Sequence, residues 1–182
     1  MKECLLLVDL QNDYFPGGKM ELVEAEKAAT NAQLLLEAFR GRKWPIIHIQ
    51  HISSRPGAGF FLPETKGVQI NERVAPRSGE VIVEKSFPNS FRETKLPEIL
   101  KKSDIKNLLI CGAMSHMCID ATTRAAFDLG FTCRVAEDAC ATRDLVFKDR
   151  TIKAMEVHGS FMAALSGLYA EVVTTREIIN RF

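Results

Sequence analysis

Three side chains of the kind that catalyse bond cleavage each follow a short apolar run of the sequence. The carboxyl group of Asp9 comes directly after Cys4–Val8, the amine of Lys85 follows Val81–Val83 by one residue, and the thiol of Cys118 comes shortly after a third run. A carboxylate can take up and return a proton, an ammonium can stabilise an anion, and a thiolate can attack a carbonyl carbon. Brought together, the three groups would form a nucleophile with its own base.

Each of these residues also has a purely structural alternative. Asp9 could bind backbone amides of the turn that follows it, and Lys85 could extend its ammonium into solvent. Cys118 could be a small buried apolar side chain, as free cysteines often are. That structural role is assigned to Cys4, Cys111 and Cys133, which lie within apolar runs, whereas Cys140 stays undecided. Only the combination of the three groups favours catalysis.

The elements that must position these residues follow the pattern of a parallel β-sheet covered by helices. Short runs rich in Val, Ile and Leu alternate with longer segments of helical periodicity, which predicts an α/β fold. The predicted strands are Cys4–Val8, Pro45–Gln50, Glu80–Glu84, Asn107–Cys111, Thr132–Ala136 and Glu171–Thr174. The predicted helices are Glu24–Arg40, Lys95–Lys101, Met117–Leu129 and Lys148–Leu165, with a final turn at Arg176–Asn180.

In such a sheet the ligand crevice lies outside the carboxyl ends of the strands, which is where all three residues fall. Cys118 is expected in the first turn of the helix that begins at Met117. The unpaired amides of that turn and a neighbouring ammonium favour the thiolate, so we predict a lowered pKa for Cys118.

Length, charge and cysteine content exclude several classes of protein. A chain of 182 residues with a net charge of +1 fits one globular domain, residues 1–182, and has no basic patch for nucleic acid or an anionic membrane. No apolar stretch reaches the roughly 20 residues of a membrane span, and no signal-peptide pattern is evident, so a cytoplasmic protein is expected. Five cysteines without a CxxC pair argue against both a disulfide framework and a structural zinc site.

Three motifs resemble those of the isochorismatase-like cysteine hydrolases. They are Val8-Asp9-Leu10-Gln11-Asn12-Asp13-Tyr14-Phe15, Lys85 with Ser90-Phe91 behind it, and Gly112-Ala113-Met114-Ser115-His116-Met117-Cys118. The resemblance implies a three-layer, Rossmann-like α/β/α fold with a six-stranded parallel sheet, and a catalytic triad of Asp9, Lys85 and Cys118. It also implies a cis peptide bond between Ala113 and Met114, and an oxyanion hole formed by the Met114 and Cys118 amides.

The implied reaction is hydrolysis of a C–N bond in a small amide, ureido or carbamoyl compound through a thioester, without a cofactor. An isochorismatase-type reaction is an alternative, although relatives with that activity lack the cysteine. A nicotinamidase-type reaction is a second alternative. Its relatives carry metal ligands after the second strand, whereas this sequence reads His51-Ile52-Ser53. Because His48 and His51 would point to opposite faces of a strand, we predict one core histidine, one loop histidine and no metal site.

Residues that would contact the substrate are less well defined by the sequence. The segment from His51 to Gly79 is rich in Gly and Pro and predicts a long, irregular and functional loop. Phe15, Phe87, Phe91 and His116 fall near the expected crevice and are candidate substrate-binding residues, with core packing or helix capping as their alternatives.

Two readings outside amide hydrolysis stay open. Cys118 could be a redox sensor, for which Cys111 would be the nearest resolving cysteine in sequence. The chain could also be a non-catalytic binding protein, which would have no need for the three groups together. The expected partners are a small-molecule substrate and further copies of the chain, because members of the resembling family commonly form homo-oligomers.

Overall fold

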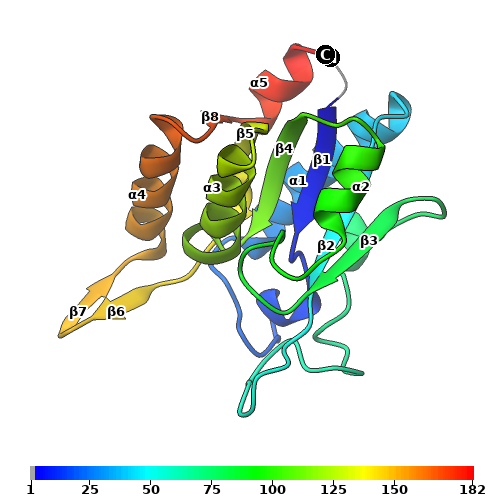
Figure 1. The fold of residues 1–182 in the computed structure, drawn as a ribbon. Coiled ribbons are helices and arrows are strands. Elements are labelled where there is room, and N and C mark those ends of the chain that lie inside the picture. Colours follow the sequence, from blue (N-terminus) through cyan, green and yellow to red (C-terminus); the bar gives the residue numbers. More distant parts are fainter. Residues whose placement is uncertain (1–2) are drawn as a thin grey trace.

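The computed structural model describes residues 3–182, and its centre is a six-stranded parallel β-sheet (Figure 1). In spatial order the strands are β3 (Val81–Lys85), β2 (Ile46–His51), β1 (Glu3–Val8), β4 (Asn107–Ala113), β5 (Thr132–Ala141) and β8 (Glu171–Val173). The central strands are continuous apolar runs because helices cover both of their faces. The prediction of an α/β fold with this sheet is confirmed, and β5 continues beyond its predicted end.

The direction in which strands are added reverses at the centre of the sheet. Val8, the last residue of β1, lies opposite Ile49 of β2 on one side and Gly112 of β4 on the other. Open parallel sheets bind their ligands at such a reversal, outside the carboxyl ends of the strands. Asp9 follows β1 there, and Met114 follows β4.

The helices form two layers, one on each face of the sheet (Figure 1). The first layer contains α2 (Leu96–Lys102), α3 (Asp120–Asp128) and α4 (Ala154–Ser166), and the second contains α1 (Ala25–Gly41) and α5 (Thr175–Asn180). Strand β1 shows the division, because Leu6 and Val8 pack in the cluster with the first layer and Leu5 and Leu7 in the cluster with the second.

The predicted long loop connects β2 to β3 and contains only the short 3-10 helix η2 (Glu72–Val74). It is tied to the segment after β1, where another 3-10 helix, η1, spans Asn12–Tyr14. The Gln11 side-chain amide donates to the Val68 carbonyl over 2.7 Å, and the Phe61 backbone amide donates to the Asp13 carboxylate over 2.6 Å. The loop therefore packs beside the carboxyl end of β1.

Residues 148–153 are not helical, so the prediction of a helix from Lys148 is wrong at its start. A hairpin of β6 (Leu145–Phe147) and β7 (Arg150–Ile152) stands there, and α4 begins only at Ala154. Lys148 has a positive φ of 53°, which a tight turn tolerates and a helix does not. The helix starts where the Ala154 amide can donate to the Asp144 carboxylate over 2.8 Å.

The chain before α3 forms a π-helical turn, η3 (Ser115–Ile119), where the sequence predicts ordinary α-helix from Met117.

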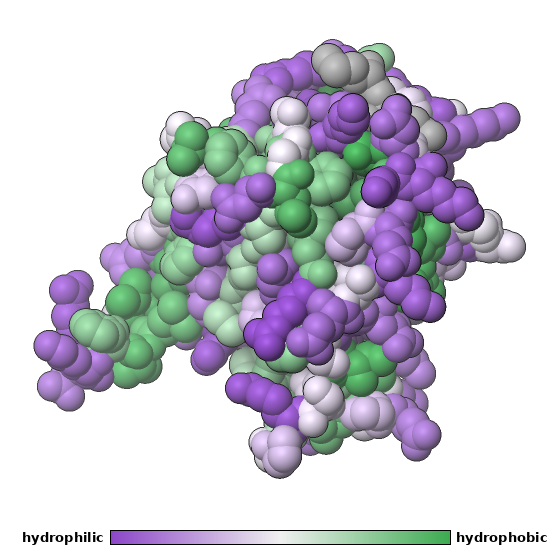
Figure 2. Space-filling model, in the orientation of Figure 1, coloured by the Kyte–Doolittle hydropathy of each residue, from purple (hydrophilic) through white to green (hydrophobic). Residues whose placement is uncertain are grey.

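On the face seen in Figure 2, hydrophilic side chains predominate, and apolar side chains gather over the hairpin and the α3–α4 layer. Val146 and Phe147 at the hairpin are 74% and 67% exposed. Among the described residues, no helix has both the length and the apolar character required to cross a membrane.

Candidate active site

The Lys85 ammonium is the centre of a buried polar cluster at the carboxyl ends of the strands. Its Nζ donates to Asp9 Oδ2 at 2.6 Å, His51 Nδ1 at 3.0 Å, the Phe87 carbonyl at 3.1 Å and Cys118 Sγ at 3.2 Å. The side chains of Asp9 and Lys85 are fully buried, and Cys118 is 4% exposed. The structure thus brings the three sequence-predicted residues into one cluster.

Asp9 owes its position to the close packing of β1 against β4. Its amide donates to the Ile49 carbonyl over 3.0 Å, and its φ of 52° turns the chain away from the strand direction. Gly112 lies opposite Val8, and a Cβ at Gly112 would stand 2.0 Å from the Val8 carbonyl oxygen. Glycine is therefore required on β4 for β1 to approach so closely at the site.

The lysine and the cysteine have pKa values set by burial and by each other. Burial disfavours the Lys85 ammonium, but its interactions with Asp9 and Cys118 outweigh that effect, so the pKa of Lys85 is raised. Burial and the Asp9 carboxylate raise the pKa of Cys118 far above its usual value, although Lys85 opposes them. The predicted low-pKa thiolate is therefore wrong for the resting site, because desolvation outweighs the ammonium and the helical turn.

In the resting site, a neutral Cys118 thiol thus lies near the Asp9 carboxylate, which can accept a further hydrogen bond. Oxygen Oδ1 of Asp9 is buried and has no hydrogen-bond partner in the described chain. The Cys118 sulfur lies within 4.8 Å of a carboxylate oxygen of Asp9. A buried carboxylate oxygen without a partner, this near a thiol, is the kind of group that can act as its base.

His51 is the member of the cluster that our sequence analysis assigned to the loop. It is the last residue of β2, and burial lowers its pKa to about 4 despite the neighbouring Asp9 carboxylate. The signal was available, since His51 directly follows the predicted strand that ends at Gln50. His48 behaves as the predicted core histidine: it is buried, and its Nε2 lies 3.0 Å from Glu80 Oε2.

The segment between β4 and the cysteine offers a backbone donor to the site. The Ala113–Met114 peptide bond is cis, and the Met114 amide donates to no group within residues 3–182. The Met114 carbonyl accepts from the Met117 and Ile119 amides, at 3.0 Å and 3.2 Å, and so holds the turn that carries Cys118. An unpaired backbone N–H is the kind of group that can stabilise an oxyanion.

The four predicted substrate-binding residues lie in different surroundings. Phe15 is buried in a cluster with Met114, and Phe91 packs against Phe131 in the core cluster that also contains Cys118. Phe87 gives its carbonyl to Lys85, and its ring is stacked under the Arg92 guanidinium, 3.7 Å from the ring centre. His116 Nδ1 lies 2.6 Å from the Thr142 hydroxyl, and burial and Arg143 lower its pKa.

The cluster also contains groups that ordinarily bind metals. Potential ligand atoms of Asp9, His51 and Cys118 lie within 4.8 Å of one another. However, the Lys85 ammonium is in hydrogen-bond contact with all three, so a cation would have to displace it. These residues as arranged fit an internal ammonium better than a metal ion.

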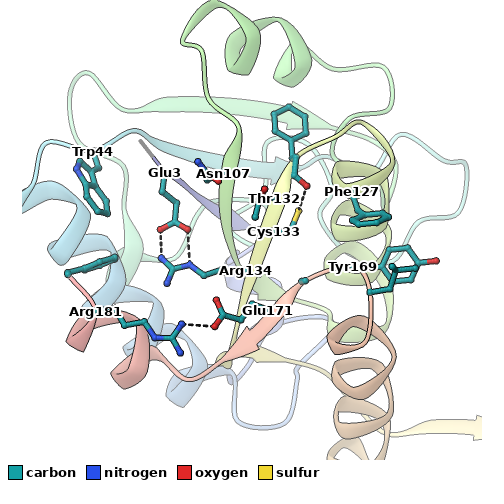
Figure 3. A pocket seen from close by; sticks show the side chains of 14 residues that line it. Glu3, Trp44, Asn107, Phe127, Thr132, Cys133, Arg134, Tyr169, Glu171 and Arg181 are labelled. Atoms are coloured by element: carbon teal, nitrogen blue, oxygen red, sulfur yellow. Dashed lines mark hydrogen bonds and ion pairs between the residues drawn. The ribbon is translucent and has the colours of Figure 1, made fainter. Parts of the chain in front are cut away.

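A cavity of about 500 Å³ lies at the other end of the strands, where their amino ends meet (Figure 3). It is lined by Glu3, Asn107, Thr132 and Glu171, which begin β1, β4, β5 and β8. The acidic groups here are paired, Glu3 with Arg134 and Glu171 with Arg181. This amino-end cavity is lined by none of the three catalytic candidates, so it is separate from the candidate active site.

Comparisons with known proteins connect this geometry to one family. Residues 3–177 match the isochorismatase domain. The isochorismatase family protein YddQ of Bacillus subtilis is 50% identical over 99% of this chain and 100% of its own. A crystal structure of an isochorismatase-like protein from Oleispira antarctica has a TM-score of 0.95 and 48% identity, covering 98% of this chain and 96% of that one.

More distant relatives have names that state a reaction. Streptothricin hydrolase of Streptomyces noursei is 30% identical over 93% of this chain and 58% of its own. Ureidoacrylate amidohydrolase RutB of Azorhizobium caulinodans is 26% identical, over 75% of this chain and 74% of its own. Nicotinamidase 3 of Arabidopsis thaliana is 27% identical, over 76% of this chain and 73% of its own.

Proposed function

Because this chain belongs to the isochorismatase family of hydrolases, we propose that it cleaves the C–N bond of a small amide, ureido or carbamoyl compound with Cys118 as nucleophile. The observation that carries the proposal is the contact of one buried ammonium, Lys85, with both the Asp9 carboxylate and the Cys118 sulfur. The names of the amidohydrolase and nicotinamidase relatives support a C–N bond as the target.

In the first half of the reaction, Asp9 takes the thiol proton as the Cys118 sulfur attacks the substrate carbonyl carbon. The unpaired Oδ1 is the oxygen free to receive that proton. The S–C bond forms, and the carbonyl oxygen becomes an oxyanion that the Met114 amide can bind. Asp9 then gives its proton to the leaving nitrogen, the C–N bond breaks, and an amine or ammonia departs from a thioester.

In the second half, a water molecule attacks the thioester carbon while Asp9 accepts one of its protons. The C–S bond breaks, the product leaves as a carboxylic or carbamic acid, and Asp9 returns the proton to Cys118. The Lys85 ammonium is charged in the resting site, where Asp9 and Cys118 raise the pKa of Lys85. Its role is to hold the carboxylate and to stabilise negative charge on the sulfur.

The test is amine or ammonia release from a panel of carboxamides, including nicotinamide, with ureido and carbamoyl compounds alongside. Cys118→Ala should lose turnover by at least about a thousandfold and remain folded, because the substitution removes the nucleophile and only one buried sulfur atom. Cys133→Ala, a buried cysteine on β5, is the matched control and should retain wild-type turnover. Full activity of Cys118→Ala would refute the assignment, and loss of wild-type activity with a chelator would indicate a metal.

The same experiment separates the alternatives. Turnover of isochorismate without any amide hydrolysis would favour the isochorismatase-type reaction. The redox-sensor hypothesis requires a reactive thiolate and a resolving cysteine, whereas the pKa of Cys118 is raised and Cys111 packs in the cluster on the other face of the sheet. A protein that turns over nothing and leaves Cys118 unacylated would be a binding protein.

Assembly and location stay predictions. We expect a homo-oligomer of a single-domain cytoplasmic chain that acts on a small molecule without nucleic acid or membrane as partner. Light scattering on the eluting protein gives the mass to compare with the 20.3 kDa of one chain. A monomer at all concentrations would contradict the expected assembly.

A further inference from the structure

We propose that His51 is a positioning residue of this site, whose neutral ring accepts one N–H of Lys85 and so keeps the ammonium on Asp9 while Cys118 carries the acyl group. The inference rests on the proposed function, since it concerns the acylated stage of that reaction. It begins from the short contact between His51 Nδ1 and Lys85 Nζ, 3.0 Å.

The contact determines which nitrogen of His51 carries the proton. An ammonium can only donate, so Nδ1 must present its lone pair, and the ring is neutral with its hydrogen on Nε2. The charged groups that face the ring are Asp9, Lys85 and Arg55. Burial is the largest influence on the pKa of His51, and together with the two cations it outweighs Asp9 and keeps the ring neutral.

The number of acceptors around Lys85 changes during the proposed reaction. At rest, four acceptors surround three N–H groups, so one hydrogen is shared. Once Cys118 is acylated, a sulfur lone pair is delocalised into the thioester carbonyl, so this sulfur is a poorer acceptor than the weakly accepting sulfur of the resting thiol. The acceptors that remain are Asp9, His51 and the Phe87 carbonyl, one for each N–H.

Removing His51 therefore matters at one stage only. The resting site would still have three acceptors for the three N–H groups, and acylation would proceed. In the acylated site a buried ammonium hydrogen would have no partner, which is costly, and Lys85 would shift away from Asp9 to find one. Asp9 is the base for water in that step, so deacylation would slow.

His51 is itself held in place by a buried amide. The His51 backbone N–H donates to Gln11 Oε1 over 2.7 Å, and Gln11 Nε2 donates back to the His51 carbonyl over 2.9 Å. Gln11 is fully buried and also binds the Val68 carbonyl. The ring lies near Phe61, with 5.8 Å between ring centres. The Gln11 contacts fix the backbone of His51, and with it the point from which the ring reaches Lys85.

Three substitutions distinguish an acceptor from a space-filling ring. His51→Asn puts an amide oxygen where Nδ1 lies, His51→Leu has nearly the same size without an acceptor, and His51→Gln moves its polar group toward the position of Nε2. His48→Gln is the matched control, since it lies on the same strand and keeps the contact to Glu80.

The probe is p-nitrophenyl acetate, whose burst of nitrophenolate reports acylation of Cys118 and whose steady rate reports deacylation by water. Intact-mass spectrometry locates the acetyl group, and Cys118→Ala gives the background. We expect His51→Leu and His51→Gln to keep the burst and to deacylate at least tenfold more slowly. His51→Asn should deacylate within about threefold of wild type, and His48→Gln should match wild type.

Three results would overturn the inference, and the first two are distinguishable from the third. A His51→Leu variant that acylates and deacylates like wild type, or a His51→Asn variant as slow as His51→Leu, would remove the role of His51 alone. A wild-type protein that takes up no acetyl group on Cys118 would overturn the proposed function, and with it the acylated stage. Equal unfolding midpoints of Asn and Leu variants exclude a difference in folding.

Discussion

Asp9 has two opposing effects on the cysteine at the scale of single residues. Its carboxylate is the base in the proposed reaction, and its charge helps to keep the pKa of Cys118 raised. The substitution Asp9→Asn should therefore lower the rate of hydrolysis by at least about a hundredfold. The same variant should alkylate faster with iodoacetamide at pH 8, by about tenfold, because the thiol ionises more readily beside Lys85 alone.

The two rates are measured on one preparation, with intact mass to locate the label. Asp138→Asn is the control, since that carboxylate binds the Thr175 amide and hydroxyl at the start of α5, both at 2.7 Å. It should leave both rates as in wild type. Unchanged or slower alkylation of Asp9→Asn would contradict the effect assigned to the Asp9 charge.

What the sequence predicted at this scale depended on the ends of the strands. Asp9 and Lys85 stand where apolar runs stop, so the parallel-sheet pattern was enough to bring them together. His51 was assigned to the loop because the predicted second strand ends one residue earlier, at Gln50, whereas β2 includes His51. The state of Cys118 could not be predicted, because the helical turn and the lysine favour a thiolate while the burial that opposes them exists only in the folded chain.

At the scale of elements, β1 and β4 must approach more closely than a side chain on Gly112 would allow. Gly112 has a φ of 125°, and a Cβ there would meet the Val8 carbonyl at 2.0 Å. Gly112→Ala should therefore lower the free energy of unfolding by about 3 kcal/mol or more, since both strain and a backbone clash oppose the fold. Hydrolysis by the folded fraction should fall too, because Asp9 adjoins Val8.

Gly159→Ala is the matched control on helix α4. No atom lies within 4 Å of a Cβ at Gly159, and alanine is the better helix former by about 1 kcal/mol. We expect Gly159→Ala to unfold at equal or higher denaturant concentration, measured by circular dichroism in urea. Comparable stability of the two variants would show that the close approach of β1 and β4 is not a constraint on the fold.

Two elements near the site depart from the sequence prediction for physical reasons. The hairpin of β6 and β7 stands where helix was predicted, because Lys148 adopts a positive φ that a helix does not tolerate. The chain must first turn back before the Ala154 amide can donate to the Asp144 carboxylate, and the helix begins there. The π-helical turn before α3 arises from two amides, those of Met117 and Ile119, converging on the Met114 carbonyl. Neither arrangement has a periodic apolar signature, and each depends on a contact made in the folded chain.

For the molecule as a whole, the buried histidines and one acidic group predict two steps of acid destabilisation. Burial lowers the pKa of His48, and it lowers that of His51 to about 4, whereas an unfolded histidine titrates near 6.5. Between these values the unfolded chain binds more protons, so the free energy of unfolding falls as pH falls from about 6.5 to 4. Burial raises the pKa of Glu80, but hydrogen bonds from the Arg40 side chain, the Arg77 backbone amide and the His48 ring outweigh it and lower that pKa to about 2. The contribution of Glu80 is lost below about pH 4.5.

Urea unfolding followed at intervals from pH 7.5 to 3 should therefore show a first loss of stability that depends on His51. His51 changes the free energy of unfolding by at most about 3 kcal/mol, which is the difference between its folded and unfolded pKa values converted to energy. His51→Asn removes the titrating ring and should lose less stability than wild type between pH 6.5 and 4. Below that window the two proteins should lose stability in parallel, because Glu80 and its partners are the same in both. If His51→Asn instead follows wild type throughout, the His51 ring is protonated in the folded protein near its usual pH, and the Lys85 ammonium must have another acceptor.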